Sequence, residues 1–154
     1  MTEPAAHDFA KILETTMKDG WMGAMGLKIV TATVDEVVGE LEIGPQHLQA
    51  YGIVHGGVHA GIIETLTSVG AALNALADGR SVVGLENHTS FLRAVRKGKL
   101  RAVAKPLSRG RRSQVWEGFV YDEQQKLAAS GRVRLLALEP EAQLAGTRVE
   151  PTLR

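Results

Sequence analysis

Glu64 is the single acidic residue in a long stretch of the sequence that is otherwise almost free of charge. No other carboxylate occurs between Glu42 and Asp78, and no Lys or Arg occurs between Lys28 and Arg80. An unpaired charge is costly to bury unless the protein uses it. A carboxylate in this setting can serve as a nucleophile or as a base that activates water.

The residues that precede Glu64 indicate a second chemical group. Gly56 and Gly57 follow His55 where a helix is expected to begin, and glycine leaves backbone N–H groups uncovered there, at the positive end of the helix dipole. This end of a helix suits an anion or an oxyanion that forms during a reaction. Ser68 lies one turn after Glu64, so both side chains would face the same incoming group.

The spacing of these groups predicts how they must be assembled. Gly56 and Glu64 are 8 residues apart, which is roughly 12 Å along a helix at about 1.5 Å per residue. A Glu side chain cannot close that gap, so one reacting carbonyl cannot touch both groups of one chain. Two antiparallel copies of the helix can provide both, because each N-terminus then lies beside the other copy's Glu64. We therefore predict a two-fold homodimer with paired composite sites.

The helix that positions these residues is predicted over residues 56–77. At about 100° per residue, one of its sides is apolar and the opposite side is small or polar. The apolar side, which we expect to form the core stripe, consists of Ile62, Leu66, Val69 and Leu73, with Leu76 at its edge. The opposite side, which we expect to be open to a ligand or another backbone, consists of Ala60, Gly61, Glu64, Thr67, Ser68, Ala71 and Ala75. His59 falls toward the core stripe, which favours a structural role for it.

The remaining segments predict an α+β fold. Residues 7–18 read as an amphipathic helix, which either closes the edge of the core or lines a pocket for an acyl group, and Trp21, Met22 and Met25 follow it as bulky apolar groups. A nearly uncharged central helix implies that a sheet wraps around it. Short loops between β-branched segments imply that this sheet is antiparallel. The strand candidates are residues 27–34, 37–43, 81–92, 100–106, 113–121 and 127–138.

Length and composition indicate one globular domain. The chain has 154 residues, of which 44% are hydrophobic and 23% are charged, as is ordinary for a soluble protein. We expect the domain over residues 7–138, between an N-terminal tail (1–6) and a loosely attached C-terminal tail (139–154). The absence of cysteine excludes disulfides and thiolate chemistry. We find no secretory signal, and polar residues interrupt the central helix, so we expect a cytoplasmic protein with no membrane partner.

A basic block follows the central helix. Nine Lys and Arg residues and no acidic residue lie between Asn87 and Trp116, although the formal net charge of the whole chain is only +1. Such a block needs either an anionic partner or solvent around it.

The candidate residues also resemble a known family. The pattern consists of Gln49, five intervening residues, His55-Gly56-Gly57, and then Glu64 and Ser68. It is similar to that of hotdog-fold acyl-CoA thioesterases. Within them it resembles most the phenylacetic-acid-pathway (PaaI-like) group and the Arthrobacter-type 4-hydroxybenzoyl-CoA thioesterases. The resemblance extends from about Met25 to Leu138. It implies a hotdog fold, with an antiparallel six-stranded sheet wrapped around a long central helix and a short N-terminal helix. Later segments that add to it are Val83-Gly84-Leu85-Glu86, Phe91-Leu92-Arg93, Lys105-Pro106-Leu107, Gly110 and Gln114-Val115-Trp116.

The resemblance implies a role for each matching residue. Glu64 would be the nucleophile or the base, and Gly56 would donate its N–H to the thioester oxygen. Gln49 and His55 would orient the carbonyl, and Ser68 would position water or steady Glu64. No metal or separate cofactor is implied, since CoA is part of the substrate, and the family's dimers commonly pair into tetramers. The phosphates of CoA would dock on the basic block, with Arg93, Arg109, Arg111 and Arg112 as the preferred contacts.

Other functions remain open for this scaffold. A hotdog dehydratase or hydratase uses a His with a carboxylate as acid and base, and the His-Gly-Gly entry with a downstream Glu fits hydrolysis better. A non-enzymatic module could bind acyl-CoA or nucleic acid, but the basic block lacks interleaved aromatic residues for base stacking.

His55 and His59 are spaced like a zinc-binding pair without a third ligand, and His88 is left without a role. From the resemblance alone we expect an aromatic acyl group, with a medium-chain one as the other choice.

Overall fold

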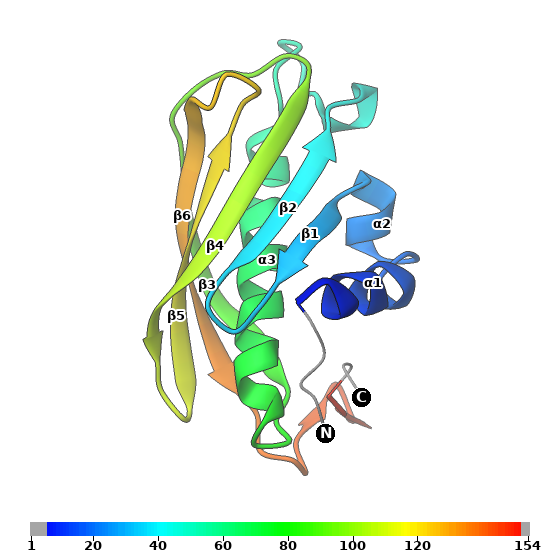
Figure 1. The fold of residues 1–154 in the computed structure, drawn as a ribbon, viewed down its shortest axis with the longest axis vertical. Coiled ribbons are helices and arrows are strands. Elements are labelled where there is room, and N and C mark those ends of the chain that lie inside the picture. Colours follow the sequence, from blue (N-terminus) through cyan, green and yellow to red (C-terminus); the bar gives the residue numbers. More distant parts are fainter. Residues whose placement is uncertain (1–5, 152–154) are drawn as a thin grey trace.

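The computed structural model describes residues 6–151, with side chains from residue 9 onward. Two short helices precede a six-stranded antiparallel sheet that curves around one long helix (Figure 1). The helices are α1 (Ala6–Thr16), α2 (Trp21–Met25), the 3₁₀ turn η1 (Pro45–His47) and α3 (Gly56–Leu76). The strands are β1 (Lys28–Ala32), β2 (Val37–Glu42), β3 (Val82–Phe91), β4 (Lys99–Arg109), β5 (Ser113–Tyr121), β6 (Leu127–Ala137), β7 (Gln143–Leu144) and β8 (Thr147–Arg148). This arrangement confirms the α+β architecture predicted from the sequence.

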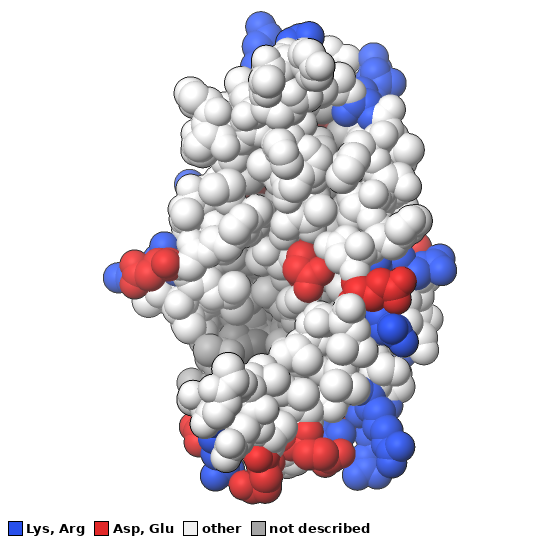
Figure 2. Space-filling view, turned by 180° about the vertical axis from the view of Figure 1, so that it is seen from behind, with Lys and Arg blue, Asp and Glu red and all other residues white. Residues whose placement is uncertain are grey.

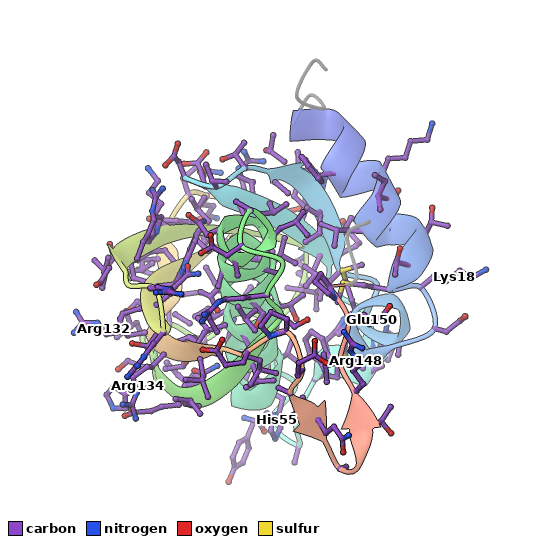
Figure 3. All side chains as sticks on the ribbon, turned by 90° about the horizontal axis from the view of Figure 1, so that it is seen from below. Lys18, His55, Arg132, Arg134, Arg148 and Glu150 are labelled. Carbon is purple, nitrogen blue, oxygen red and sulfur yellow. The ribbon has the colours of Figure 1, made fainter. Side chains whose placement is uncertain are left out.

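The order of the strands in the main sheet is β1-β2-β4-β5-β6-β3, so β1 and β3 form its two edges. The chain leaves β2 through α3, returns as β3 at the far edge, and then crosses back to β4. Charged side chains such as Arg132 and Arg134 project from the outer side of the sheet, away from α3 (Figure 3). Within residues 6–151, no helix is both long and apolar enough to cross a membrane.

Close contact between α3 and the sheet forms the core. Ile62 and Leu66, on the predicted core stripe, are each only 1% exposed. The fully buried ring of Trp116 on β5 packs directly on Gly70 of α3, where an added Cβ would lie 2.3 Å from a ring carbon. Interiors packed this tightly tolerate little extra volume. A larger residue at position 70 would therefore push the sheet away from the helix that carries the candidate site.

Strand β4 extends beyond Pro106, the residue at which the sequence predicted its end. β4 was expected to stop at Pro106 but continues to Arg109. Pro106 lies beyond Ala104, the last residue of β4 that pairs with β2, so its missing N–H removes no bond on that side. A bulge at Leu107 then lets the pairing with β5 resume.

Two further segments differ from the expected ones. Residues 21–25, expected only as bulky apolar groups, form helix α2. The C-terminal tail expected over residues 139–154 contains the hairpin β7–β8, and Glu139 at its start is ion-paired with the buried Arg80. Residues 1–5 and 152–154 of the two expected tails lie outside the described residues.

Strand β3 is an exposed edge strand of 10 residues. Most of its side chains are exposed, including Leu85 and Phe91 at 51% and 59%. Figure 2 shows the side of the molecule that faces away in Figure 1: charged side chains lie mainly around its margins, and most of its surface is uncharged. A long exposed edge offers unpaired backbone groups to which another strand can bind.

Candidate active site

His55 caps the N-terminus of α3. Its backbone is extended, and its ring Nδ1 accepts a hydrogen bond from the Gly57 N–H at 2.8 Å. Because Nδ1 is the acceptor, the neutral ring carries its proton on Nε2. The bond uses the Gly57 donor and leaves the Gly56 N–H without an acceptor among the described residues. His55 itself lies at the surface of the molecule (Figure 3).

Gln49 lies in the loop that leads to His55. Its side-chain oxygen accepts a hydrogen bond from the Tyr51 N–H at 2.7 Å. Arg96 holds the same loop by donating to the carbonyls of Tyr51 and Gly52 at 2.8 and 3.2 Å. Since the side-chain oxygen of Gln49 is used by the backbone, its NH₂ group is left as the donor for a ligand.

A cavity of about 300 Å³ lies at the N-terminal end of α3. Gly56 and Gln49 both line it, so two of the predicted carbonyl-binding groups meet in one space. Phe91 of β3 lines it as well and packs over Gly56, where an added Cβ would lie 2.7 Å from the ring. Glycine at position 56 therefore gives room to the Phe91 ring in its present position and keeps the N–H uncovered.

His59 lines the same cavity from the core side of α3, as its place on the predicted helix indicated. Its ring is 2% exposed, and its Nδ1 has no hydrogen-bond partner among the residues that the structure describes. Burial lowers the pKa of His59 to about 4, because the charged ring would lose its hydration. Within residues 6–151, neither His55 nor His59 belongs to a group of three potential metal ligands.

Glu64 and Ser68 line a second cavity, of about 410 Å³, at the middle of α3. Leu13 of α1, Met17 directly after α1 and Val82 of β3 also line it, so its wall is largely apolar. Residues of α1 therefore both line a cavity and pack in the core. A half-buried carboxylate thus borders an apolar space.

Strand β3 supplies contacts to Glu64 that the sequence did not reveal. Asn87 Nδ2 donates hydrogen bonds to Glu64 Oε2 at 3.0 Å and to the Ala60 carbonyl at 3.1 Å. Thr89 Oγ1 in turn donates to Asn87 Oδ1 at 2.6 Å. These residues are more than 20 positions from Glu64, and only the path of β3 along α3 brings them to it.

The open face of α3 is narrower than expected. Thr67 and Ala71, which we expected on that face, are 0% exposed, and Ala75 is also buried. The expectation was wrong because the sheet encloses more of the helix than its apolar stripe. Thr67 tolerates this burial because its hydroxyl donates to the Ile63 carbonyl at 2.8 Å. Glu64 and Ser68 remain partly exposed, as predicted.

The four arginines expected to contact CoA do not form one cluster in a protomer. Arg93 lines the cavity at the N-terminal end of α3. Arg109 and Arg111 line a different cavity, of about 350 Å³, near the C-terminal end of α3, and Arg109 is ion-paired with Asp35. Arg112 lies in the turn between β4 and β5.

The fold and the site define a class of protein. A six-stranded antiparallel sheet wrapped around one long helix is the hotdog arrangement, here with a carboxylate at mid-helix and glycines at the helix N-terminus. Residues 51–129, which are 79 of the 154 residues, match the thioesterase superfamily. The chain belongs to this superfamily.

Similar proteins agree with this assignment. The Mycobacterium tuberculosis protein Rv1847, whose name proposes an esterase, is 39% identical over 117 residues, which cover 75% of this chain and 84% of that protein. The proofreading thioesterase EntH of Cronobacter turicensis is 36% identical over 127 residues, which cover 82% of this chain and 92% of that protein. The crystal structure of the Haemophilus influenzae thioesterase HI1161 has a TM-score of 0.80 at 29% sequence identity and covers 90% of this chain and 93% of that one. These similarities support thioester hydrolysis as the reaction.

Proposed function

We propose that this protein hydrolyses an acyl-CoA thioester to a free acid and CoA, at composite sites formed by two copies of the chain. The observation that carries the proposal is the division of the candidate groups between two cavities. Gly56 and Gln49 line one cavity, and Glu64 and Ser68 line the other. Gly56 and Glu64 are 8 positions apart, so their separation along α3 is too long for one thioester group to bridge within a protomer.

In the proposed reaction the thioester oxygen accepts hydrogen bonds from the Gly56 N–H and the Gln49 side chain. When the carbonyl carbon becomes tetrahedral, these donors stabilise the negative charge on that oxygen, typically by about 3 kcal/mol each. Glu64 either attacks this carbon, forming an anhydride that water then hydrolyses, or takes a proton from the water that attacks. CoA leaves as a thiolate and takes up a proton, and Ser68 positions the water.

The exposed edge of β3 supports a way in which two protomers could combine. β3 runs along α3 so that Gly84 packs against Glu64 and Phe91 packs against Gly56. Two antiparallel copies of β3 paired about Asn87 would place the Gly84 end of one strand opposite the Phe91 end of the other. Glu64 of one protomer would then lie near the helix N-terminus of its partner. By analogy with the family, we further propose that two such dimers pair.

The cavity beside Glu64 suits the acyl group of the substrate. Its volume of about 410 Å³ lies within the range of roughly 300–1,000 Å³ found for small-molecule pockets. Leu13, Met17 and Val82 make it largely apolar, which favours an acyl group without charge. We therefore propose an aromatic or medium-chain acyl group.

The phosphates of CoA are assigned in this proposal to the basic block. Arg93 is the preferred contact, since it lines the same cavity as the carbonyl-binding groups. Arg109, Arg111 and Arg112 lie nearer the other end of α3 and would contribute only where the partner subunit brings that end toward the site. A CoA ester as substrate also fits the cytoplasmic location that we propose, with which the absence of cysteine is compatible.

A panel of acyl-CoA esters tests the proposed function. We expect the protein to release free thiol from benzoyl-CoA, phenylacetyl-CoA or medium-chain acyl-CoA, and Glu64→Ala to abolish this release. Loss or addition of water without thiol release would instead indicate a dehydratase or hydratase. Tight binding without turnover would indicate a binding module. Thiol release that persists undiminished in Glu64→Ala would contradict the role of Glu64.

A further inference from the structure

A chain of hydrogen bonds from β3 holds one oxygen of the Glu64 carboxylate. Asn87 donates to Oε2 at 3.0 Å and, through the same Nδ2, to the Ala60 carbonyl at 3.1 Å. The Thr89 hydroxyl donates to Asn87 Oδ1 at 2.6 Å. A hydroxyl that donates to Oδ1 orients the Asn87 amide with its NH₂ group toward Glu64. Oε1 accepts no hydrogen bond from the described residues.

Gly84 makes room for the other oxygen. An added Cβ at position 84 would lie 2.3 Å from Glu64 Oε1, far inside the contact distance of a carbon and an oxygen. The φ angle of Gly84 is not in the left-handed region, so its backbone conformation does not demand glycine. Space beside the carboxylate is the physical reason for glycine at this position.

A β-bulge brings both features to the same side of the strand. Gly84 and Glu86 pair with consecutive residues of β6, so Leu85 is an extra residue in β3. Positions 84 and 87 would face opposite sides of a regular strand, because side chains alternate. The extra residue turns Asn87 back toward α3, where it reaches Glu64.

We propose that Asn87, oriented by Thr89, and Gly84 are positioning residues for Glu64, an inference that rests on the proposed hydrolysis. Asn87 holds Oε2 and thereby fixes the rotation of the carboxylate. Oε1 is then the oxygen that attacks the thioester carbon or takes the proton from water. Gly84 keeps Oε1 in place, because any side chain at that position would displace it.

Paired substitutions at Thr89 test the orientation of the amide. Thr89→Val keeps the branched shape and removes the hydroxyl, so we expect kcat to fall about 10-fold while KM stays within about twofold of the wild-type value. Thr89→Ser keeps the hydroxyl and should restore kcat. Asn87→Ala should lower kcat at least as far as Thr89→Val. Unchanged kcat in Asn87→Ala, or a change confined to KM, would overturn the proposal.

Gly84→Ala tests the space beside Oε1. We expect kcat to fall by about 10-fold or more, with thermal unfolding measured in parallel to confirm that the variant folds. Gly20→Ala is the matched control, because among the described residues an added Cβ there comes near only the Met17 carbonyl, at an ordinary 3.7 Å. Equal kcat values for the two alanine variants would contradict the role of Gly84.

The ¹³Cδ resonance of Glu64 gives a readout that does not depend on turnover. We expect it to move in Asn87→Ala and Gly84→Ala and to keep its wild-type position in Thr89→Ser. If it moves as expected but the wild type hydrolyses no thioester, the positioning contacts stand and the proposed function fails. If the wild type hydrolyses thioesters while Asn87→Ala changes neither the resonance nor kcat, the positioning role fails alone.

Discussion

Glu64→Gln separates the charge of this residue from its shape. Glutamine has nearly the same size and can still accept the hydrogen bond from Asn87, but it can neither attack a thioester effectively nor take a proton from water. We therefore expect kcat to fall about 10³-fold, with KM within about threefold of the wild-type value. Free thiol release measures both constants. Glu42→Gln, at an exposed position of β2, is the control, and a loss below about 10-fold in Glu64→Gln would argue against catalysis by the carboxylate.

His59 gives a prediction about stability and pH. Its folded-state pKa is about 4 and its ordinary value is 6.5, so between these values the unfolded chain binds a proton more readily than the folded chain. The stability that depends on the neutral ring is complete above the unfolded pKa and is lost as the pH falls toward the folded one. We expect this residue to lower the free energy of unfolding by about 2 kcal/mol between pH 7 and pH 5. Urea unfolding across this range should show a smaller decrease in His59→Phe, and equal decreases in the two proteins would refute the assignment.

At the scale of single residues, sequence spacing was enough to relate the candidate groups carried by α3 and its entry loop to one another. Gly56, Glu64 and Ser68 could be related because helical geometry fixes their separation. Asn87 and Gly84 could not, since their place beside Glu64 depends on the path of β3 and on an extra residue within it. A single bulge within the 10 residues of β3 leaves no periodic signal in the sequence.

At the scale of elements, α1 and α3 enclose the cavity proposed for the acyl group. Ala72 lines this cavity as a small residue, so Ala72→Leu should shorten the space available. We expect kcat/KM for an octanoyl ester to fall at least about 10-fold more than that for an acetyl ester. Ala24→Leu, at an exposed position of α2 outside the lining, should leave the ratio unchanged. A parallel decrease for both esters in Ala72→Leu would place the acyl group elsewhere.

The elements that could be predicted are those with a strong repeating pattern. The long helix and the six strands of the main sheet were found near their expected bounds. Helix α2 was missed because five residues between Gly20 and Gly26 carry no periodicity, and its formation depends on the burial of Met22. The hairpin β7–β8 was missed because each strand has only two residues, and Gly146, with φ of 80°, makes its turn. The width of the exposed face of α3 was predicted wrongly, because the curvature of the sheet, rather than the apolar stripe, decides how much of the helix is covered.

At the scale of the whole molecule, the distribution of charge indicates which side of the protomer could bind a second copy of the chain. Apart from Glu64, the central helix carries no charge, and the charged side chains lie mainly around the margins of the surface in Figure 2. A protomer with an exposed edge strand on such a side is suited to bind a second copy. The second copy would also complete the proposed site. Gly56 and Glu64 lie far apart along α3 and line different cavities of one protomer, so neither cavity contains both groups.

Mixed dimers test this assembly directly. Glu64→Ala removes the carboxylate, and Gly56→Pro removes the oxyanion N–H at a helix position that tolerates proline, with room made by the 59% exposed Phe91. Each variant alone should be inactive, but co-refolding equal amounts should form about half mixed dimers, each with one intact site of two. We therefore expect the mixture to regain about one quarter of wild-type thiol release. A mixture no more active than its separate components, although tagged subunits show that mixed dimers have formed, would mean that each site is built within a single chain.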